Sequence, residues 1–326
     1  MKKGVSSGKE RRYAAAWETI LLIVLPLISL ALAALILVPA VKNYLQHERD
    51  RAAAMAYEEE EAPLRLRVET RNPEPFYDLS DPFFGWRQEN GELYYIGDDG
   101  RPLTGLQRID GRLYYFAPDG RKASALGVDV SFYNEDVNWR EVREQGIDFV
   151  IVRLGGRGWS TGLLYGDIRT AQYLHNAHEA GLRVGAYFYS TAGSESEAAE
   201  EARAALRVLE GQTLELPVFI DVEESGEYPD GRSDVLTRDE RTRVIEAFCR
   251  VVEAGGYEAG VYSGHYFYNT SMHVKAFGNR MIWIANYTAS EMDRVPDFEH
   301  GYEIWQFTDS GQVKGITGYS DLNVIF

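Results

Sequence analysis

The stretch "LPVFIDVEESG" at residues 216–226 joins an apolar run to three carboxylates. The run is typical of a buried strand, and Asp221, Glu223 and Glu224 lie at its C-terminal end. Because side chains alternate across a strand, Asp221 and Glu223 share one face, with backbones about 6.6–7 Å apart, and Glu224 points to the other face. Two carboxyls this close in a partly buried pocket cannot ionise independently, so we expect one to stay protonated near neutral pH.

From Leu126 onward, short strands rich in β-branched and aromatic residues alternate with helical stretches. The helical stretches 167–181, 194–211 and 237–256 all end in Gly, as helix C-termini often do. Repeated βα units within about 200 residues predict an α/β domain with a parallel, barrel-like sheet. The predicted strands are 126–132, 149–155, 183–190, 217–223, 258–263, 281–287, 302–309 and 321–326, the last three without long helices between them.

Acidic residues also stand at the ends of two other predicted strands. Asp129 lies near the end of one strand, and Asp321 opens the last one. In a barrel of this kind, functional groups collect at the C-terminal ends of the strands. A protonated acid beside ionised partners is what cleavage of a glycosidic bond requires. Taken singly, the Asp-x-Glu pair also fits a salt-bridged strand end or a helix N-cap, and Asp321 also fits a turn-capping residue.

Residues 20–41 contain no charge, and as a helix they would be about 33 Å long, enough to cross a bilayer. Basic residues precede this run, so the positive-inside rule places residues 1–19 in the cytoplasm. We expect a single-pass anchor in the cell membrane, with the rest of the chain outside and facing the cell wall. A cleaved signal peptide is the alternative, and it also exports the chain. Residues 42–84 have the composition of a solvated linker.

An internal repeat of about twenty residues follows at 85–124. "GWRQENGELYYIGDDGRPLT" aligns with "GLQRIDGRLYYFAPDGRKAS", and each copy predicts one β-hairpin. These units resemble the cell-wall-binding repeats of choline- and glucan-binding type, and this implies aromatic contacts to a wall polymer. Leu106 departs from that pattern, since Trp is expected there, and a purely structural collar is the alternative. The matching aromatic residues are Trp86, Tyr94, Tyr95, Tyr114 and Tyr115.

Residues 125–326 form the predicted catalytic domain, and most of it resembles the glycoside hydrolase family 25 lysozymes. The resemblance runs in order through "GVDVS", "FVIVRLG", "VGAYFYS", "PVFIDVEE", "GVYSG", "WIANY", "IWQFT" and "DLN". It implies an irregular TIM-like (β/α)5(β)3 barrel that cleaves the β-1,4 bond between N-acetylmuramic acid and N-acetylglucosamine in peptidoglycan.

The resemblance also assigns roles to residues. Glu223 matches the general acid, and Asp221 the partner that orients the substrate's acetamido group or stabilises developing positive charge. Asp129 and Asp321 match the acids of the pocket floor. Candidate substrate-binding residues are Tyr187, Tyr189, Tyr262, Trp283, Tyr287, Arg153 and Asn323. Of these, Arg153 is expected to act as an electrostatic partner of Asp129 or Asp221, and each aromatic residue fits the core equally well.

Composition restricts the partners. The formal net charge of −16 disfavours nucleic acid. The single cysteine, Cys249, lies in a helical stretch and is expected in the core. We expect no metal site, because no Cys/His cluster has ligand spacing, and the resemblance implies no cofactor.

Two other functions remain open at this point. A chitinase-like endo-N-acetylglucosaminidase also places Asp-x-Glu at a strand end, but the further upstream aspartates of that family are replaced here by Leu216 and Phe219. A non-catalytic scaffold that binds the wall is the second alternative, and the presence of all four acids disfavours it.

Overall fold

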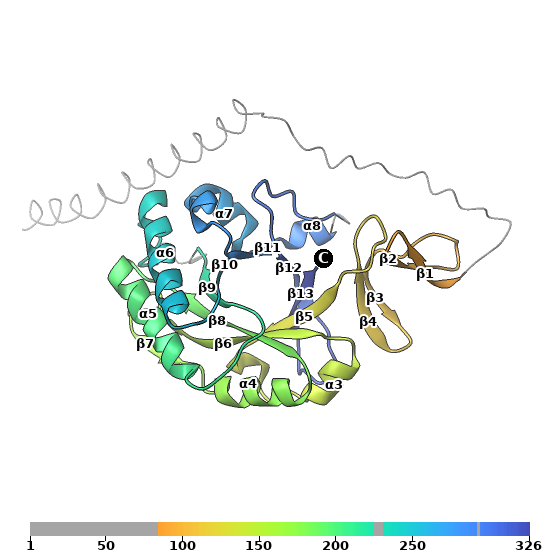
Figure 1. The fold of residues 1–326 in the computed structure, drawn as a ribbon, viewed down its shortest axis with the longest axis horizontal. Helices are drawn as coiled ribbons and strands as arrows, with labels where there is room; N and C mark the ends of the chain where they lie inside the picture. The colour runs from red at the N-terminus through yellow and green to blue at the C-terminus, as the bar shows by residue number, and fades with distance from the viewer. Residues whose placement is uncertain (1–83, 225–230, 292–293) are drawn as a thin grey trace, which may run out of the picture. The chain divides into compact units, whose positions relative to one another are not determined.

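The structure, a computed structural model, describes residues 84–224, 231–291 and 294–326. Eight strands pair in the order β5–β13–β12–β11–β10–β9–β8–β6, and β5 pairs with β6 to close the ring (Figure 1). Neighbouring strands from β5 round to β12 run parallel, while β13 is antiparallel to both β12 and β5. The barrel strands are β5 (Ala125–Val130), β6 (Phe149–Arg157), β8 (Arg183–Ser190), β9 (Val218–Val222), β10 (Ala259–Gly264), β11 (Met281–Ala285), β12 (Ile304–Gly311) and β13 (Ser320–Ile325).

Helices follow each of the first barrel strands and cover the outside of the sheet (Figure 1). After β11 only a five-residue helix intervenes, and β12 leads to β13 without one. The predicted irregular barrel, with helices early and strands alone at the end, is therefore confirmed. The helices are α3 (Trp139–Glu144), α4 (Thr170–Glu179), α5 (Glu195–Val208), α6 (Arg238–Ala254), α7 (His265–Ser271) and α8 (Tyr287–Glu291), with 3₁₀ turns at Phe132–Asn134 and Val274–Phe277.

Two of the three predicted helices begin at side-chain caps. The hydroxyl of Ser194 accepts the backbone N–H of Glu197 at the start of α5. Thr237 and Glu240 form a reciprocal capping box at the start of α6. Cys249 is fully buried in α6, as expected. The short strand β7 (Leu164–Gly166), which pairs antiparallel with β6, was not expected from the sequence.

Alternation along the strands sorts the side chains into two apolar layers. The outward-facing residues pack under the helices, and the inward-facing ones fill the barrel. The rings of Phe149 and Phe219 lie inside the barrel, where a Cβ on Gly127 or Gly260 would approach them to 2.3 and 2.4 Å. Glycine at these two positions is therefore what admits both rings.

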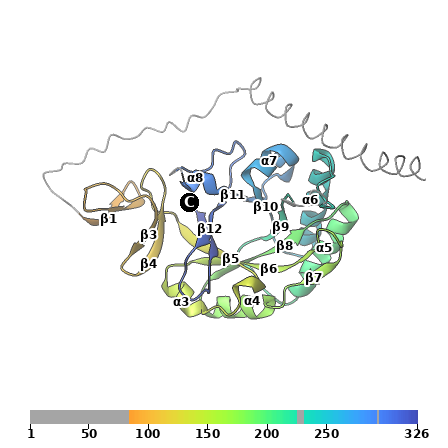
Figure 2. The same cartoon turned by 180° about the vertical axis from the view of Figure 1, so that it is seen from behind.

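The repeat at 85–124 forms two hairpins, β1 (Gly85–Glu89) with β2 (Glu92–Ile96), and β3 (Gly105–Ile109) with β4 (Arg112–Phe116). Both turn pairs, Asn90-Gly91 and Asp110-Gly111, have positive φ at each residue, as a type I′ turn requires. The predicted hairpins are therefore present. The second lies next to β5, and the first lies beyond it, away from α5 and α6 (Figure 2).

The second hairpin packs into the barrel itself. The Tyr115 ring is 4% exposed and contacts Phe307 at 4.5 Å and Trp305 at 5.7 Å between ring centroids. Leu113 joins the same apolar cluster, and the side chain of Gln145 donates to the carbonyl of Gly111 at 3.1 Å. Residues 105–124 thus pack as part of the same folded unit as the barrel. The sequence had predicted that the catalytic domain begins at residue 125.

The predicted anchor at 20–41 and linker at 42–84 lie almost wholly outside the described residues, which include only Phe84 of the linker. Within residues 84–224, 231–291 and 294–326, none of the helices has the length and apolar content needed to span a bilayer.

Candidate active site

Four acidic side chains converge at one end of the barrel. Asp129 and Asp221 lie near the C-terminal ends of β5 and β9, and Glu223 is the first residue after β9. Because β13 runs antiparallel, its first residues lie at the same end, and Asp321 pairs directly with Asp129. The structure therefore brings together the four acids selected from three distant segments.

Asp129 and Asp321 form a hydrogen-bonded pair on the floor of the site. Asp129 is buried, and its Oδ1 accepts hydrogen bonds from Gln306 Nε2 at 2.9 Å and Asn323 Nδ2 at 2.8 Å. Burial, followed by the charge of Asp129 and their hydrogen bond, raises the pKa of Asp321 to about 9. Asp321 therefore keeps a proton at neutral pH and donates it toward Asp129.

Asp221 and Glu223 form a second hydrogen-bonded pair at the rim. Asp221 is 4% exposed, and burial, followed by the charge of Glu223, raises its pKa well above its usual range. Glu223 is exposed to solvent at the mouth of the site, but protein surrounds it closely enough that lost hydration also raises its pKa. The pair therefore retains a proton under conditions in which two isolated carboxyls would lose both.

Asp221 Oδ1 is buried and has no hydrogen-bond partner. A buried acceptor without a donor is costly unless something else satisfies it. The arrangement is thus suited to a ligand N–H at this position, next to a carboxyl proton that can be transferred.

The predicted aromatic residues divide into two groups. Tyr187, Tyr189 and Tyr287 are half-buried around the acids, and their contact with a substrate stays a prediction. Trp283 is 1% exposed and packs inside the barrel against Phe219. The stacking role considered for Trp283 is therefore wrong, because the ring has no open face.

Two more predicted ligands, Tyr262 and Asn323, are also buried, at 8% and 0% exposure. Tyr262 donates its hydroxyl to Gln306 Oε1 at 2.8 Å, and Asn323 accepts from the indole N–H of Trp283 at 2.7 Å. Both side chains hold neighbouring groups in place. Asn323 has no exposed surface, so direct contact with a substrate was the wrong expectation for it, and substrate contact by Tyr262 stays a prediction.

Arg153 was expected to pair with Asp129 or Asp221, but its ion pair is with Asp167, at 3.0 Å between Nε and Oδ2. The strand β6 continues four residues beyond Arg153, two more than predicted. Its guanidinium lies over the rings of Phe132 and Tyr133, at 5.1 and 5.3 Å from their centroids. Its charge still reaches Asp221, whose pKa it lowers against the larger effect of burial.

Gln306 was not among the residues predicted for the site, but it contacts Asp129 and two tyrosine hydroxyls and is 2% exposed. The signal was present, because Gln306 is a polar residue between the apolar residues Trp305 and Phe307 of a predicted strand. Asp167, the partner of Arg153, was also not predicted, because no pattern in the sequence distinguishes it from other acidic residues.

In the repeats, Trp86 packs edge-on against Tyr95 at 5.2 Å and against Tyr114 at 4.9 Å between ring centroids. Tyr94 is half-buried nearby. Tyr115 does not belong to this aromatic group, because the barrel covers it, so its predicted wall-binding role is wrong.

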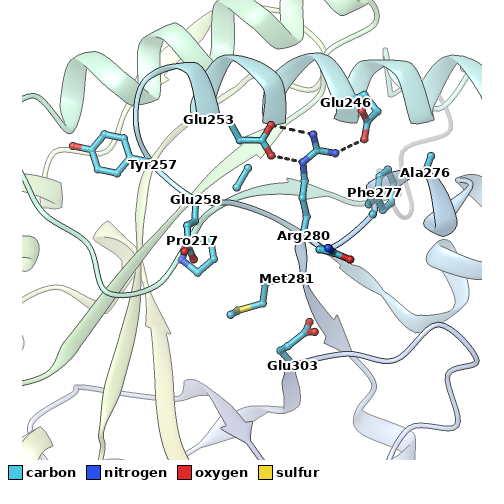
Figure 3. Close-up of a pocket in the computed structure, with 13 residues that line it drawn as sticks. Pro217, Glu246, Glu253, Tyr257, Glu258, Ala276, Phe277, Arg280, Met281 and Glu303 are labelled. Atoms are coloured by element: carbon cyan, nitrogen blue, oxygen red, sulfur yellow. Dashed lines mark hydrogen bonds and ion pairs between the residues drawn. The ribbon is translucent and has the colours of Figure 1, made fainter.

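A cavity of about 700 Å³ opens at the other end of the barrel, near the starts of β9, β10 and β11 (Figure 3). The carboxylates of Glu246 and Glu253 in its wall both bind Arg280. None of the four converging acids lines it, so we assign the chemistry to the opposite end. Among the described residues, no group of three or more His, Cys, Asp or Glu side chains is placed to hold a metal ion.

Two family models match the chain. One, described as glycosyl hydrolases family 25, matches residues 128–316, more than half of the chain. The other, described as a putative cell wall binding repeat, matches residues 85–101.

Among curated proteins, the chain is 29% identical over 204 residues to the uncharacterized protein YegX of Escherichia coli K12, covering 61% of this chain and 68% of YegX. It is 27% identical over 197 residues to the autolytic lysozyme of Clostridium acetobutylicum, covering 60% of this chain and 54% of that protein.

Among solved structures, the modular autolysin LytC from Streptococcus pneumoniae matches with a TM-score of 0.59 and 24% sequence identity. The match covers 74% of this chain and 58% of LytC, so this chain spans less than two thirds of that protein. At this identity the likeness establishes the fold alone.

Proposed function

Since the chain belongs to glycosyl hydrolases family 25, we propose that it cleaves the β-1,4 bond between N-acetylmuramic acid and N-acetylglucosamine in peptidoglycan. Its barrel is a glycoside hydrolase domain of the lysozyme type. The observation that carries the proposal is the convergence of two hydrogen-bonded pairs of acids at one end of the barrel.

Glu223 is the general acid in this proposal. It lies at the open mouth of the site, where lost hydration raises its pKa, and it shares with Asp221 a proton that the pair retains. Its proton passes to the bridging oxygen as the glycosidic bond breaks and positive charge develops on the sugar. Asp221, with its free buried oxygen, accepts the N–H of the 2-acetamido group and stabilises that charge.

The Glu223→Gln variant tests this assignment in the full chain. We expect it to bind peptidoglycan but to lose cleavage by about 10²–10⁴-fold, because an amide cannot donate the proton. The measurement is release of soluble fragments, with the new reducing ends identified by mass spectrometry. Glu224→Gln is the matched control, since Glu224 is the adjacent exposed carboxylate and its loss should leave cleavage near that of the parent.

Other outcomes of this experiment select the alternatives. New reducing ends on muramic acid support the proposal, and new reducing ends on glucosamine support the chitinase-like activity. Binding without cleavage by the parent chain itself would indicate a scaffold.

We also propose that residues 20–41 anchor the chain in the cell membrane, with the N-terminus cytoplasmic and the barrel facing the wall. The support is the uncharged run and the basic residues before it. Extraction of the full-length chain from membranes by detergent, but not by high salt, is the expected result. Recovery of a shortened chain in the medium would instead support a cleaved signal peptide.

The first repeat is the proposed wall-binding element, since the match to a cell wall binding repeat covers residues 85–101. Trp86 is its central ring, in contact with Tyr95 and Tyr114. Trp86→Ala should weaken sedimentation of the chain with purified walls, and unchanged sedimentation would argue for a structural collar.

A further inference from the structure

Two buried side-chain amides meet on one oxygen of the pocket floor. Asn323 Nδ2 and Gln306 Nε2 lie 2.8 and 2.9 Å from Asp129 Oδ1. Both amides are almost fully buried, at 0% and 2% exposure, so water cannot replace their partners. The orientation of each amide therefore determines whether that oxygen must accept hydrogen bonds.

The orientation of Asn323 follows from Trp283. The indole nitrogen can only donate a hydrogen bond, and it lies 2.7 Å from the side-chain oxygen of Asn323. If the amide were reversed, two donors would face each other in a buried site. Asn323 must therefore present its NH₂ group to Asp129.

The orientation of Gln306 follows from the same oxygen and from two tyrosines. Its Oε1 lies 2.8 Å from the hydroxyls of both Tyr262 and Tyr287, which can each donate to it. Reversal would place the Gln306 oxygen against Asp129 Oδ1, which already accepts from Asn323. Because the indole N–H of Trp283 can only donate, it fixes the donor and acceptor roles along the whole chain of hydrogen bonds, through Asn323 and Asp129 to Gln306 and both tyrosine hydroxyls.

We propose that Gln306 and Asn323 are positioning residues that keep Asp129 as the ionised carboxylate of the floor and leave the shared proton of the pair on Asp321. Two amide donors on one oxygen favour its charged form. Asp321 receives no such amide donor from the residues that the structure describes, so it becomes the donor of the pair. The proposal deepens the proposed function and rests on it for its catalytic consequence.

That consequence is transmitted by charge. A fixed negative charge on Asp129 opposes ionisation of Asp221 and Glu223, and so raises the pKa of both. The two amides thereby help Glu223 to hold its proton without touching it. Other titratable or charged groups also act on the four acids: Arg153 on β6, Tyr165 on β7, Tyr187 and Tyr189 on β8, Tyr262 on β10, Tyr268 on α7, Tyr287 on α8 and Asp309 on β12.

The test compares Gln306→Leu with the parent in the full chain. Loss of one donor raises the pKa of Asp129, so its negative charge is lost at a higher pH than in the parent. The pKa of Glu223 then falls, because less negative charge lies near it. The alkaline limb of the kcat profile on peptidoglycan should therefore move to lower pH by about one unit. A lower kcat with an unmoved limb would overturn the proposal.

A second measurement does not depend on activity. At mildly acid pH the folded Gln306→Leu variant should bind more protons at the floor pair than the parent does, and the unfolded chain releases them. Tm should therefore fall more steeply in the variant as pH rises from 5 to 8. Gln145→Leu is the matched control, because Gln145 is a buried glutamine (7% exposed) at the seam between hairpin and barrel. It should lower Tm at all pH values without changing the slope.

Trp283→Phe is the third variant, and it decides the matter if Gln306→Leu does not fold. It removes the indole N–H that orients Asn323, so it should change the slope of Tm against pH in the same direction, by a smaller amount. The proposal would be overturned if the slope of Tm against pH equals that of the parent in every variant that folds. If the parent cleaves nothing, the proposed function fails, while the Tm slopes still test the role of the amides.

Discussion

At the scale of single residues, Asp321 differs from an ordinary strand-end aspartate because its partner is another acid. Asp129 lies directly across from it, and two amides stabilise the charge of Asp129. The proton is therefore retained by the residue with fewer donors. A raised pKa at Asp321 means that the folded chain binds a proton that the unfolded chain releases.

This difference predicts how Asp321→Asn changes stability with pH. The folded-state pKa of Asp321 is about 9, against an unfolded value of about 3.9, so its contribution disfavours folding increasingly as pH rises through that window. Asn cannot ionise and can still donate to Asp129. Relative to the parent, the variant should gain on the order of 1–2 kcal/mol between pH 5 and 8, since the pair shares one proton and the full shift does not apply.

Thermal unfolding at several pH values measures this effect. Asp309→Asn on β12 is a suitable control, because Asp309 is an exposed carboxylate near the same pair. Curves of Tm against pH that run parallel for Asp321→Asn and the parent would contradict the assigned proton.

At the scale of elements, β9 shows what sequence could predict. Its apolar run and the spacing of Asp221 and Glu223 predict a strand and a shared face, and both are observed. The inward-facing side chains of β11 show what the sequence could not predict. Trp283 lies on the correct face, but Tyr187, Phe219 and Tyr262 surround it inside the closed ring. Strand period determines which face a residue occupies, and only the packing of neighbouring strands determines whether that face is open.

The second hairpin packs against the barrel more closely than the repeat pattern in the sequence indicated. Repeat similarity placed it with the first hairpin, although it shares the core of the barrel through Leu113 and Tyr115. The substitution of Trp by Leu at residue 106 was visible in the sequence as a departure from the repeat. The sequence did not show why this substitution occurs, because the surface that β4 covers is formed by residues almost 200 positions later, at Trp305 and Phe307.

This packing predicts that Tyr115→Ala destabilises the barrel. The ring is 4% exposed, so its loss should lower the free energy of unfolding by about 3–5 kcal/mol. Urea denaturation of the full chain, followed by tryptophan fluorescence, measures it. Tyr95→Ala, at the equivalent position of the first hairpin, removes a half-buried ring and should cost less. Equal costs for the two variants would mean that the second hairpin is no more integral than the first.

At the scale of the whole molecule, a formal charge of −16 accompanies a site that is itself built from acids. Intact peptidoglycan with its attached polymers is anionic, so long-range repulsion opposes the approach of the chain. The site compensates locally by retaining two protons among its four carboxyls, one in each pair, but this does not change the field at a distance. The approach to the wall and the chemistry at the wall should therefore respond differently to salt.

Ionic strength separates the two steps. Raising it from roughly 10 mM to roughly 150 mM shortens the Debye length from about 30 Å to about 8 Å, so the repulsion between the chain and an intact wall is largely screened. We expect kcat/KM on whole walls to rise severalfold over this range, with kcat nearly constant, because the buried pairs of acids are little affected by salt. Cleavage of a short, uncharged glycan fragment should show no such rise, since it experiences no repulsion. A fall in kcat/KM on whole walls with added salt would mean instead that attraction through the repeats governs the encounter.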